Sequence, residues 1–425
     1  MKKMLFLLFM FFLANFFFAC SEDSPNSPNN GNSSDSNNPS GGNIAGSYAV
    51  LPSNKDLDKV REMYNTWIQT LYITIEDDAA AGTFNINNVG EAVRGTARIK
   101  ASYSGCTGGG CTVSEAIGYG MILTVLMEDW EKFDKLYAYS KAFYIQGSSL
   151  MRWDVVNFTS GKGGSATDAD IDIAAALLVA YKKNAPKKQE YLDGALAIAA
   201  SIYEWEIDAT TKLVLPAMRS ERMGDGSLYN ISYMSLPALK MFAEFDKTRD
   251  WNAVLDANIA YMEKVQNAGP GLWPDWSDPS GAAINPANSS NTILTATDGS
   301  SVNSWESYYK EGPRIPWRIA WYYHWYGDSR AKNMLDKGIA FLRLKGATDY
   351  KGIKDFYKYD GTKESNGSSV MARSSLCALG MGNSANSEWL NSCNEWMINE
   401  YTVSISQYYP ASLRLIYAML FNGTF

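Results

Sequence analysis

Histidine is almost missing from this 425-residue chain, because His324 is the only one. A Ser-His-Asp hydrolase would need it as the base, and no GxSxG nucleophile elbow is present. His324 lies in the aromatic helical run WRIAWYYHWYGD, where we expect a structural role. A Walker A motif and a strand-associated GxGxxG motif are also missing. Carboxylates and aromatic rings therefore remain as the groups that can do chemistry.

Basic residues are too few to give a positive balance. Lys and Arg total 38 against 45 Asp and Glu, a formal net charge of −7. Without a basic patch to release counterions from phosphates, binding to nucleic acid is not expected. Aromatic residues are abundant, with 13 Trp and 26 Tyr, and rings of this kind stack on the C–H faces of sugars. The composition fits a glycan binder, or simply a large aromatic core.

The chain begins with a charged start and a short apolar run. Lys2 and Lys3 precede the run and Ala19-Cys20 ends it, a pattern that indicates a secretory signal with a bacterial lipoprotein cleavage site. The run is shorter than the roughly 20 residues of a membrane-spanning helix. We expect residues 1–20 to be a signal peptide and Cys20 to carry the lipid. The protein would then be anchored to the bacterial outer membrane or the cell surface.

The next segment, residues 21–43, is rich in Ser, Asn, Pro and Gly and has hardly any apolar side chains. It cannot bury enough surface to offset its ordering entropy, so we expect a flexible linker. No second linker follows. Residues 44–425 are therefore predicted to form one large catalytic domain, which we expect to be monomeric.

Apart from Cys20, four cysteines remain. Cys106 and Cys111 bracket TGGG, and Cys377 and Cys393 lie nearer the C-terminus. Export permits disulfides, and the expected pairs are 106 with 111 and 377 with 393. Metal binding is the alternative, but it is poorly supported because no CxxC spacing occurs and only one histidine is present. We expect no metal.

Helical periodicity dominates residues 44–425, and two-residue alternation is rare; LYITIED is the best strand candidate. The predicted helices come mostly in pairs separated by long loops, over residues 57–73, 115–127 and 131–144, 170–183 and 188–205, 235–245 and 251–268, 318–326 and 329–344, 368–381 and 388–399, and 412–421. Helical hairpins repeated about six times predict an all-α fold, an (α/α)6 barrel with long loops. An open solenoid is the alternative, but no fixed sequence period supports it.

Three carboxylates crowd the start of an apolar helix in SATDADIDIAAALLVAY. These are Asp168, Asp170 and Asp172. Ser165 or Thr167 can cap this helix, and an acid in its first turn suits the positive end of the helix dipole. Three acids together are different, because they repel one another at a position that the following residues predict to be buried. Like charges held in this way usually serve a site.

A fourth acid, Glu115, opens another apolar helix in CTVSEAIGYGM. It is either an ordinary first-turn acid or a carboxyl that faces a cavity beside Tyr119. In the second case desolvation would raise its pKa and keep it protonated, as a general acid requires. Gly118 and Gly120 would let a substrate or a neighbouring backbone come close.

Six blocks occur in order between about residue 50 and the C-terminus: TVSEAIGYGM, LMRWDV, SATDADIDIAAALLVA, GLWPDWSD, EGPRIPWRIAWYYHWYGD and YYPASLRLIYAMLFNGTF. Together they resemble glycoside hydrolase family 8. The ATDAD block is close to the family signature and departs from it only at its end, where Asn184 stands in place of an aromatic residue. The resemblance implies an (α/α)6 barrel with an open cleft. It also implies hydrolysis of β-1,4-linked polysaccharide or oligosaccharide with inversion, without a cofactor.

The resemblance also implies roles for individual residues. Glu115 would be the general acid. Asp168 would hold the distorted sugar ring where the bond breaks, supported by Asp170. In many members the base is an Asp three residues before the Arg of the RxPWR block; here that Arg is Arg314 and the acid is Glu311.

Glu is one methylene longer than the usual Asp. The two carboxyls of an inverting pair lie roughly 6.5–9.5 Å apart, and this range is wide enough for that difference, so Glu311 is the first candidate for the base. Alternatively, Glu311 is an ordinary surface acid in a Gly-Pro turn. Glu306, in NSWESYY, is the second candidate, and Asp278 is the third.

Further residues in these blocks would bind substrate or orient the catalytic groups. Tyr233 would position the attacking water and Arg314 would orient the base. The other expected cleft residues are Tyr119, Trp153, Trp273, Trp276, Tyr408 and Tyr409. For each aromatic residue, packing in the core is an equal alternative.

The sequence orders the substrates without deciding between them. Endo-cleavage of β-1,4-glucan stands slightly ahead of xylan, and chitosan comes last. The alternative of another class is a non-catalytic surface lipoprotein that binds glycans.

Overall fold

The computed structural model of the chain describes residues 46–82, 84–101, 110–156, 158–160, 163–284, 292–399 and 401–425. The predicted signal peptide, Cys20 and the linker lie outside these residues, and so does Cys106 with its expected bond to Cys111. Residues 41–425 form one compact unit. Within the described residues, every helix is too short or too polar to cross a bilayer.

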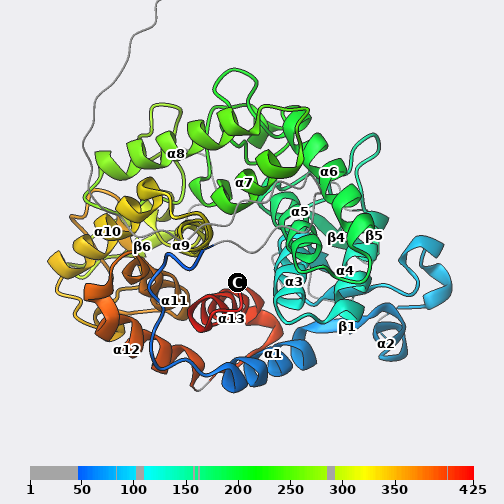
Figure 1. Ribbon diagram of the computed structural model, residues 1–425, viewed down its shortest axis with the longest axis horizontal. Coiled ribbons are helices and arrows are strands. Elements are labelled where there is room, and N and C mark those ends of the chain that lie inside the picture. The colour runs from blue at the N-terminus through cyan, green and yellow to red at the C-terminus, as the bar shows by residue number, and fades with distance from the viewer. Residues whose placement is uncertain are drawn as a thin grey trace, which may run out of the picture. The chain divides into compact units, whose positions relative to one another are not determined.

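Six helices of the described chain form an inner ring (Figure 1). They are α3 (Ser114–Leu126), α5 (Thr167–Lys182), α7 (Leu236–Phe245), α9 (Ile315–Tyr326), α11 (Val370–Cys377) and α13 (Tyr408–Asn422). Each packs on the next one in this order, and α13 packs on α3, which closes the ring. Helices α3, α5 and α13 are buried on nearly all sides, so their sequences lack the polar stripe of a surface helix.

A second set of helices covers the ring from outside. Helices α4 (Trp130–Ala142), α6 (Lys188–Trp205), α8 (Trp251–Ala268), α10 (Ser329–Leu344), α12 (Ser387–Ile398) and α1 (Leu57–Leu71) pack on α3, α5, α7, α9, α11 and α13, respectively. Helix α1 shows why: Val60, Met63, Tyr64, Trp67 and Leu71 recur at helical spacing and are buried, while the residues between them face solvent. The predicted (α/α)6 barrel is confirmed, and the solenoid alternative is wrong because the ring closes.

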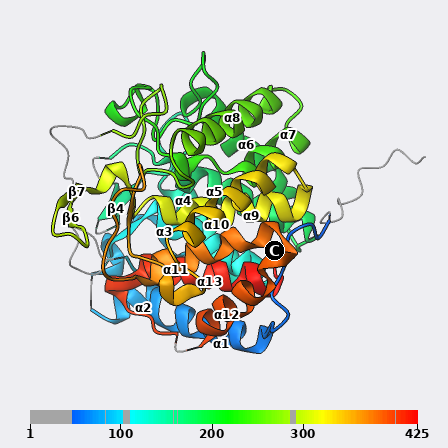
Figure 2. The ribbon, with the colours of Figure 1, turned by 90° about the vertical axis from the view of Figure 1, so that its left-hand side faces the viewer.

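The strands are short, antiparallel and confined to connecting segments. β1 (Tyr72–Thr74) pairs with β2 (Ala97–Ile99), and β4 (Asp154–Val156) lies between β3 (Thr112–Val113) and β5 (Thr159–Ser160). β6 (Ile293–Thr295) pairs with β7 (Ser301–Asn303), and β8 (Ser307–Tyr308) pairs with β9 (Tyr357–Lys358). Figure 2 shows β4, β6 and β7 at one end of the barrel and the C-terminus at the other.

The predicted strand LYITIED is only partly a strand. Its first residues pair in β1, but α2 (Ile75–Ala80) begins immediately afterwards. The switch occurs because the Thr74 side chain accepts a hydrogen bond from the Asp77 amide and caps the helix.

Three inner helices begin earlier than their apolar periodicity predicts. α5 starts at Thr167 instead of residue 170, α9 at Ile315 instead of 318, and α13 at Tyr408 instead of 412. The added turns contain Asp168, Trp317 and Tyr408, and they lie at the N-terminal ends of the inner helices. The predicted cap of α5 is wrong: Ala166 is the N-cap and has no side-chain bond, because the Ser165 hydroxyl donates to Glu206 instead.

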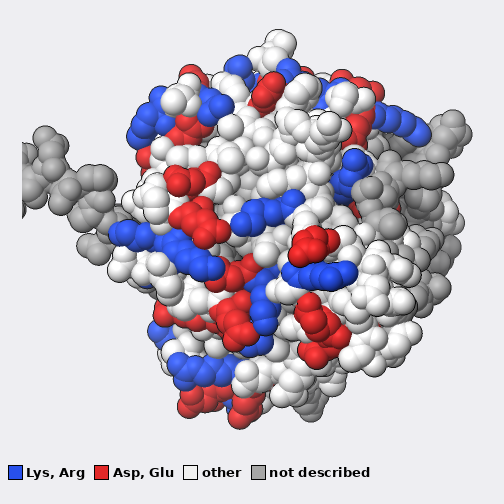
Figure 3. Space-filling model, turned by 90° about the vertical axis from the view of Figure 1, so that its right-hand side faces the viewer, with Lys and Arg blue, Asp and Glu red and all other residues white. Residues whose placement is uncertain are grey.

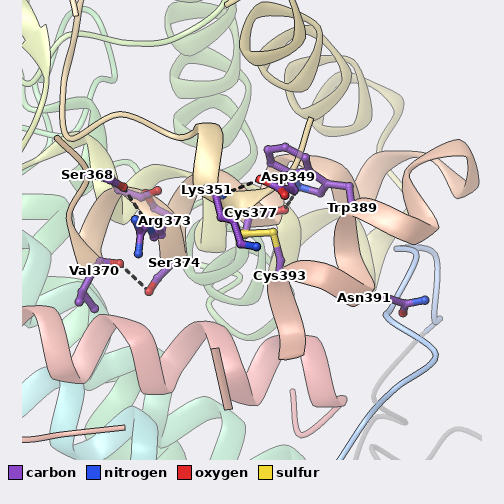
Figure 4. The surroundings of a disulfide bond; sticks show 12 residues. Asp349, Lys351, Ser368, Val370, Arg373, Ser374, Cys377, Trp389, Asn391 and Cys393 are labelled. Atoms are coloured by element: carbon purple, nitrogen blue, oxygen red, sulfur yellow. Dashed lines mark hydrogen bonds between the residues drawn. A yellow bond between two sulfur atoms is a disulfide. The ribbon is translucent and has the colours of Figure 1, made fainter. Parts of the chain in front are cut away.

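One expected disulfide lies within the described residues. Cys377, at the end of α11, is bonded to Cys393 in α12 (Figure 4). The indole N–H of Trp389 donates a 3.0 Å hydrogen bond to the Cys377 carbonyl beside it. The bond therefore fastens an outer helix to the inner helix that it covers. Helix α11 is shorter than predicted, because the chain continues as the 3-10 helix η8 (Ala378–Gly382).

Candidate active site

Side chains from the starts of several inner helices meet at one end of the ring. Glu115 is in the first turn of α3, Asp168 is in the first turn of α5, and Tyr408 is the first residue of α13. Arg314 ends the 3-10 helix η6 (Gly312–Arg314) and leads directly into α9. Because an outer helix runs back between consecutive inner helices, the inner helices point the same way and their N-termini share this end. The positive ends of their dipoles favour the carboxylates gathered there.

Arg314 binds three carboxylates that are far apart in the sequence. Its Nη1 donates to Glu115 Oε2 at 2.7 Å and to Asp168 Oδ2 at 2.5 Å, and its Nη2 pairs with Glu311. Its side chain is only 3% exposed. A guanidinium suits this task because its N–H groups form a rigid planar fork. The structure thus brings together the predicted acid, the predicted ring-holding aspartate and the first candidate for the base.

Two of the three carboxylates reach solvent and one does not. The side chain of Glu115 is 19% exposed and that of Glu311 is 26% exposed, whereas that of Asp168 is 3% exposed. Asp168 Oδ1 has no hydrogen-bond partner among the described residues. Glu115 and Glu311 therefore lie at an accessible surface, and Arg314 and Asp168 lie beneath it.

The surroundings of Glu115 favour its protonated form. Burial raises the pKa of Glu115, while the positive charge of Arg314 lowers it and the negative charge of Asp168 raises it further. The phenol of Tyr408 donates a 2.7 Å hydrogen bond to Glu115 Oε1, which also lowers the pKa. The net direction is upward, as the sequence interpretation of Glu115 requires.

Glu311 is oriented by a residue that the sequence analysis did not single out. The amide of Asn230 donates a 2.8 Å hydrogen bond to Glu311 Oε2. Asn230 Oδ1 accepts from the backbone and hydroxyl of Ser232, which fixes the orientation of the amide. Asn230 stands at the start of the NISYMSLP block, immediately before η4 (Ile231–Tyr233), so its position was the available signal. The Tyr233 ring lies 5.0 Å from the Arg314 guanidinium carbon.

The other two candidates for the base lie elsewhere. Glu306 lines a cavity of about 450 Å3 with Lys358, Tyr359 and six other residues, and neither Glu115 nor Arg314 is among them. Asp278 accepts hydrogen bonds from Ser280 and Ala282 and closes a turn. Of the three candidates, Glu311 is the one that contacts Arg314.

The remaining acids of the ATDAD block have internal partners. Asp170 is 1% exposed and accepts a 2.7 Å hydrogen bond from the Met151 amide. Asp172 is 2% exposed and pairs with Arg318 at 2.7 Å. The buried carboxyl of Asp170 therefore braces the segment that leads to Trp153, which fits the supporting role that the resemblance implies.

The expected cleft aromatics divide into two groups. Trp273 and Tyr119 are fully buried, as the alternative of core packing predicts; the Trp273 indole donates to the Met262 carbonyl. Trp276 is also buried, at 8% exposed, and stacks on Trp305 with ring centres 4.9 Å apart, whereas Trp153 is 38% exposed. Tyr233, Tyr408 and Tyr409 are partly exposed around Arg314.

Gly118 brings two inner helices close together. A Cβ at this position would lie 3.2 Å from the Asp172 Cβ and 3.4 Å from the Ala169 carbonyl oxygen. The absence of a side chain at Gly118 therefore makes room for α5. Of the two alternatives that the sequence suggested, a substrate or a neighbouring backbone, the structure shows the neighbouring backbone. A Cβ at Gly120 would lie 2.9 Å from Ile99 and from Leu136, also inside the core.

A family model described as "Glycosyl hydrolases family 8" matches residues 107–424. The chain belongs to this family. Family 8 relatives include Endoglucanase A of Acetivibrio thermocellus, which is 33% identical over 325 residues. That match covers 74% of this chain and 62% of Endoglucanase A, so the chain spans less than two thirds of that relative.

Two further similarities agree with the family 8 assignment. Beta-glucanase of Niallia circulans is 32% identical over 333 residues, covering 74% of this chain and 77% of that protein. The apo structure of a Beta-1,3-1,4-glucanase from Paenibacillus sp. X4 superposes with a TM-score of 0.72 and 26% identity, covering 90% and 97% of the two chains. The structure of Rex8A from Paenibacillus barcinonensis complexed with xylose superposes with a TM-score of 0.66 and 17% identity, covering 89% of this chain and 98% of Rex8A. This similarity shows a shared fold.

Surface charge and metal-ligand chemistry add little to this family 8 site. Among the described residues, no group of three or more His, Cys, Asp and Glu side chains could hold a metal ion. On the face shown in Figure 3, the described acidic and basic side chains are interspersed. Exposed ion pairs of the described chain include Lys135–Glu131 and Lys187–Asp134. This face offers no continuous basic patch of the kind that binds nucleic acid.

Proposed function

We propose that this family 8 protein cleaves β-1,4-linked glucan chains internally, with inversion at the anomeric carbon. The observation that carries the proposal is the contact of Arg314 with Glu115, Asp168 and Glu311. An inverting glycosidase needs one protonated and one ionised carboxyl, separated by roughly 6.5–9.5 Å. Glu115 and Glu311 contact different nitrogens of the Arg314 guanidinium, which supports two carboxyls that are near each other and separated by this group.

Glu115 is the proposed general acid. Its raised pKa favours the protonated form that a general acid needs, and its carboxyl is partly exposed, so it can reach a glycosidic oxygen. Proton donation would leave Glu115 ionised, and the two donors that already contact it, Arg314 and Tyr408, would stabilise the new charge.

Glu311 is the proposed general base. Its two contacts, Arg314 and Asn230, both donate to the carboxyl and so favour the ionised form that accepts a proton from water. The water attacks the face of the sugar opposite to the leaving group, and Tyr233 borders its position. Asp168 would accept a hydrogen bond from the distorted ring through Oδ1, which requires the sugar to displace the groups that cover this atom.

Glucan is the preferred substrate class. Endoglucanase A and Beta-glucanase are named for glucan cleavage, and the Paenibacillus structure is named as a β-1,3-1,4-glucanase, so mixed-linkage glucan belongs in any test. Xylan is the second candidate, because the likeness to Rex8A extends to the fold alone. Chitosan ranks third, since no additional acidic patch for glucosamine stands out in the sequence.

A non-catalytic glycan-binding protein is the disfavoured alternative. Holding three carboxylates around one buried Arg314 carries a desolvation cost that a binding surface does not need. Glu311 stands where an Asp is usual, and it still supplies a carboxylate at the site of the base.

The test is hydrolysis of barley β-glucan, carboxymethylcellulose, xylan and chitosan by purified protein, with Glu115→Gln as the matched inactive variant. We expect reducing ends to accumulate with glucans faster than with xylan, and the first product seen by NMR to be the α-anomer. Products that keep the β configuration would rule out the inverting assignment. Equal rates for wild type and Glu115→Gln would rule out Glu115 as the acid.

The cellular location is a separate proposal that rests on the sequence of residues 1–43. We propose export, lipid attachment at Cys20 and display of a monomeric enzyme on a flexible linker. Cys20→Ala should move the protein from the membrane fraction to the soluble fraction of the exporting bacterium. Retention of the variant in the membrane fraction would refute lipid anchoring without affecting the enzymatic proposal.

A further inference from the structure

A buried aspartate lies behind the turn that carries Glu311. Asp275 belongs to the GLWPDWSD block and is 2% exposed. Its amide donates to the Ser307 carbonyl at 2.8 Å, which places it beside β8 (Ser307–Tyr308), just before the turn. The sequence analysis did not single out this residue, although a carboxylate between two tryptophans was a signal of a buried and partnered acid.

The backbone of the turn wraps around the carboxylate of Asp275. Oδ1 accepts from the amides of Tyr309 at 3.0 Å and Gly312 at 2.9 Å, and Oδ2 accepts from the amide of Lys310 at 2.9 Å. Three of four consecutive N–H groups thus point at one side chain, an arrangement that binds anions. Glu311 is the remaining residue among these four.

The same turn is fastened from the other side by α13. The Tyr409 hydroxyl donates to the Lys310 carbonyl at 2.6 Å, and the Tyr417 hydroxyl donates to the Pro313 carbonyl at 2.7 Å. The donors of the turn are therefore bound by Asp275 and its acceptors by α13. Each of the three rotatable bonds of a glutamate side chain has only a few favoured angles. Once the backbone is fixed, the carboxyl can therefore occupy only a limited set of positions.

From these contacts, we propose that Asp275 is a positioning residue for the proposed base, Glu311. Asp275 does not touch substrate, because its oxygens are buried and bound to backbone. It fixes the backbone from which Glu311 extends, and so sets the distance between the base and the attacking water. This inference rests on the proposed function. Burial raises the pKa of Asp275 to about 7, and the three backbone N–H donors act in the opposite direction.

The test is a double-mutant cycle with Asp275→Asn and Glu311→Gln, measured as kcat and KM on the best glucan substrate. In Asp275→Asn an NH2 group replaces one acceptor and faces backbone donors, so the turn should loosen. We expect kcat to fall about 10- to 100-fold with KM changed less than about 3-fold, because a misplaced catalytic group costs about this much. In the Glu311→Gln background the same change should cost less than about 3-fold.

A matched control separates positioning from general stability. Asp246 is also a buried aspartate that braces a loop, accepting from Thr248 and from the Trp251 indole, but none of its partners contacts Glu311. Asp246→Asn should lower the melting temperature by a similar amount and leave kcat unchanged. If Asp275→Asn does not fold, Tyr409→Phe loosens the same turn from α13, and its loss of kcat should likewise vanish in Glu311→Gln.

Two results would overturn the positioning role. One is a wild-type kcat in folded Asp275→Asn while Glu311→Gln is impaired. The other is an equal fold-loss from Asp275→Asn in both backgrounds, which would mean that Asp275 acts independently of Glu311. A wild-type protein inactive on every β-1,4-glycan would instead refute the proposed function itself, before the cycle is measured.

Discussion

Tyr408 donates a 2.7 Å hydrogen bond to Glu115 from a helix that begins 293 residues later in the chain. The proposed acid is therefore held in place by the last inner helix of the ring as well as by Arg314. A hydrogen bond donated to a carboxylate stabilises its charged form, so this contact opposes the upward shift that burial gives to the pKa of Glu115.

Replacing Tyr408 by Phe should make Glu115 a weaker acid. Without the phenolic donor the charged carboxylate is less stable, so the pKa of Glu115 rises. The alkaline limb of kcat/KM, where the acid loses its proton, should then move upward by about one pH unit, the equivalent of one charge-assisted hydrogen bond. The measurement is a pH profile of kcat/KM from about pH 5 to 10. A limb that moves downward would contradict this account.

The two candidate bases should differ sharply. Glu311→Gln should lower kcat by about 10²–10⁴-fold, because the variant keeps the size of the side chain but cannot accept the proton of water. Glu306→Gln is the matched comparison and should retain most of the wild-type kcat, since Glu306 lines a different cavity. Initial rates on a soluble glucan decide this, and the opposite ranking would reassign the base to Glu306.

Arg314→Lys should be almost as damaging as loss of a catalytic acid. A lysine carries a single ammonium, which cannot hold Glu115, Asp168 and Glu311 in one plane. We expect kcat to fall by at least about 10²-fold, with the variant still folded as judged by circular dichroism. Near-normal turnover would show that the three carboxylates do not depend on their common partner.

Stability should fall as the pH rises from about 5 to about 8. Burial raises the pKa of Asp172 to about 7 and that of Glu206 to about 8, above their ordinary values near 4. The folded protein therefore binds more protons than the unfolded chain in this window, and its stability decreases with pH. Thermal melts across this range test the sign. Glu206→Gln should flatten the slope, and a melting temperature that rises between pH 5 and 8 would disprove the assignment.

Removing the disulfide should weaken the fold without changing the chemistry. The bond between Cys377 and Cys393 closes a loop with a sequence separation of 16, for which chain entropy predicts about 3 kcal/mol of stability. Cys377→Ala/Cys393→Ala should melt earlier than wild type, and its melting temperature should depend less on reductant than that of wild type. Its kcat should be unchanged at 25 °C, because neither cysteine contacts the site; a large loss of kcat would show a coupling that the contacts do not explain.

Local pattern explains most of the secondary structure that could be predicted. Apolar residues at helical spacing gave the outer helices closely, as at 188–205 and 251–268, because one face of each is buried and the other is solvated. The starts of α5, α9 and α13 were placed too late. The first turns of α5 and α13 carry Asp168 and Tyr408, which contact Arg314 and Glu115, and α9 follows directly after Arg314. A periodicity argument cannot separate such turns from loops.

The identities of the reactive groups were also present in the sequence, but not their accessibility. Glu115, Asp168 and Glu311 could be named from their blocks, whereas Trp273 and Tyr119 could equally be cleft or core residues and proved to be core. Asn230 and Asp275 escaped notice because their importance comes from what they contact. An amide or a buried aspartate has no distinctive pattern of its own.

By itself, the sequence determined that helices would dominate, that carboxylates were the candidates for the chemistry, and that the family 8 blocks would occur in order. Only the tertiary structure decided that Glu115, Asp168 and Glu311 share Arg314, and that Asp275 lies behind Glu311. The reason is physical: these contacts join positions up to 199 residues apart, and closure of the ring of inner helices, not any local preference, brings their N-terminal ends together.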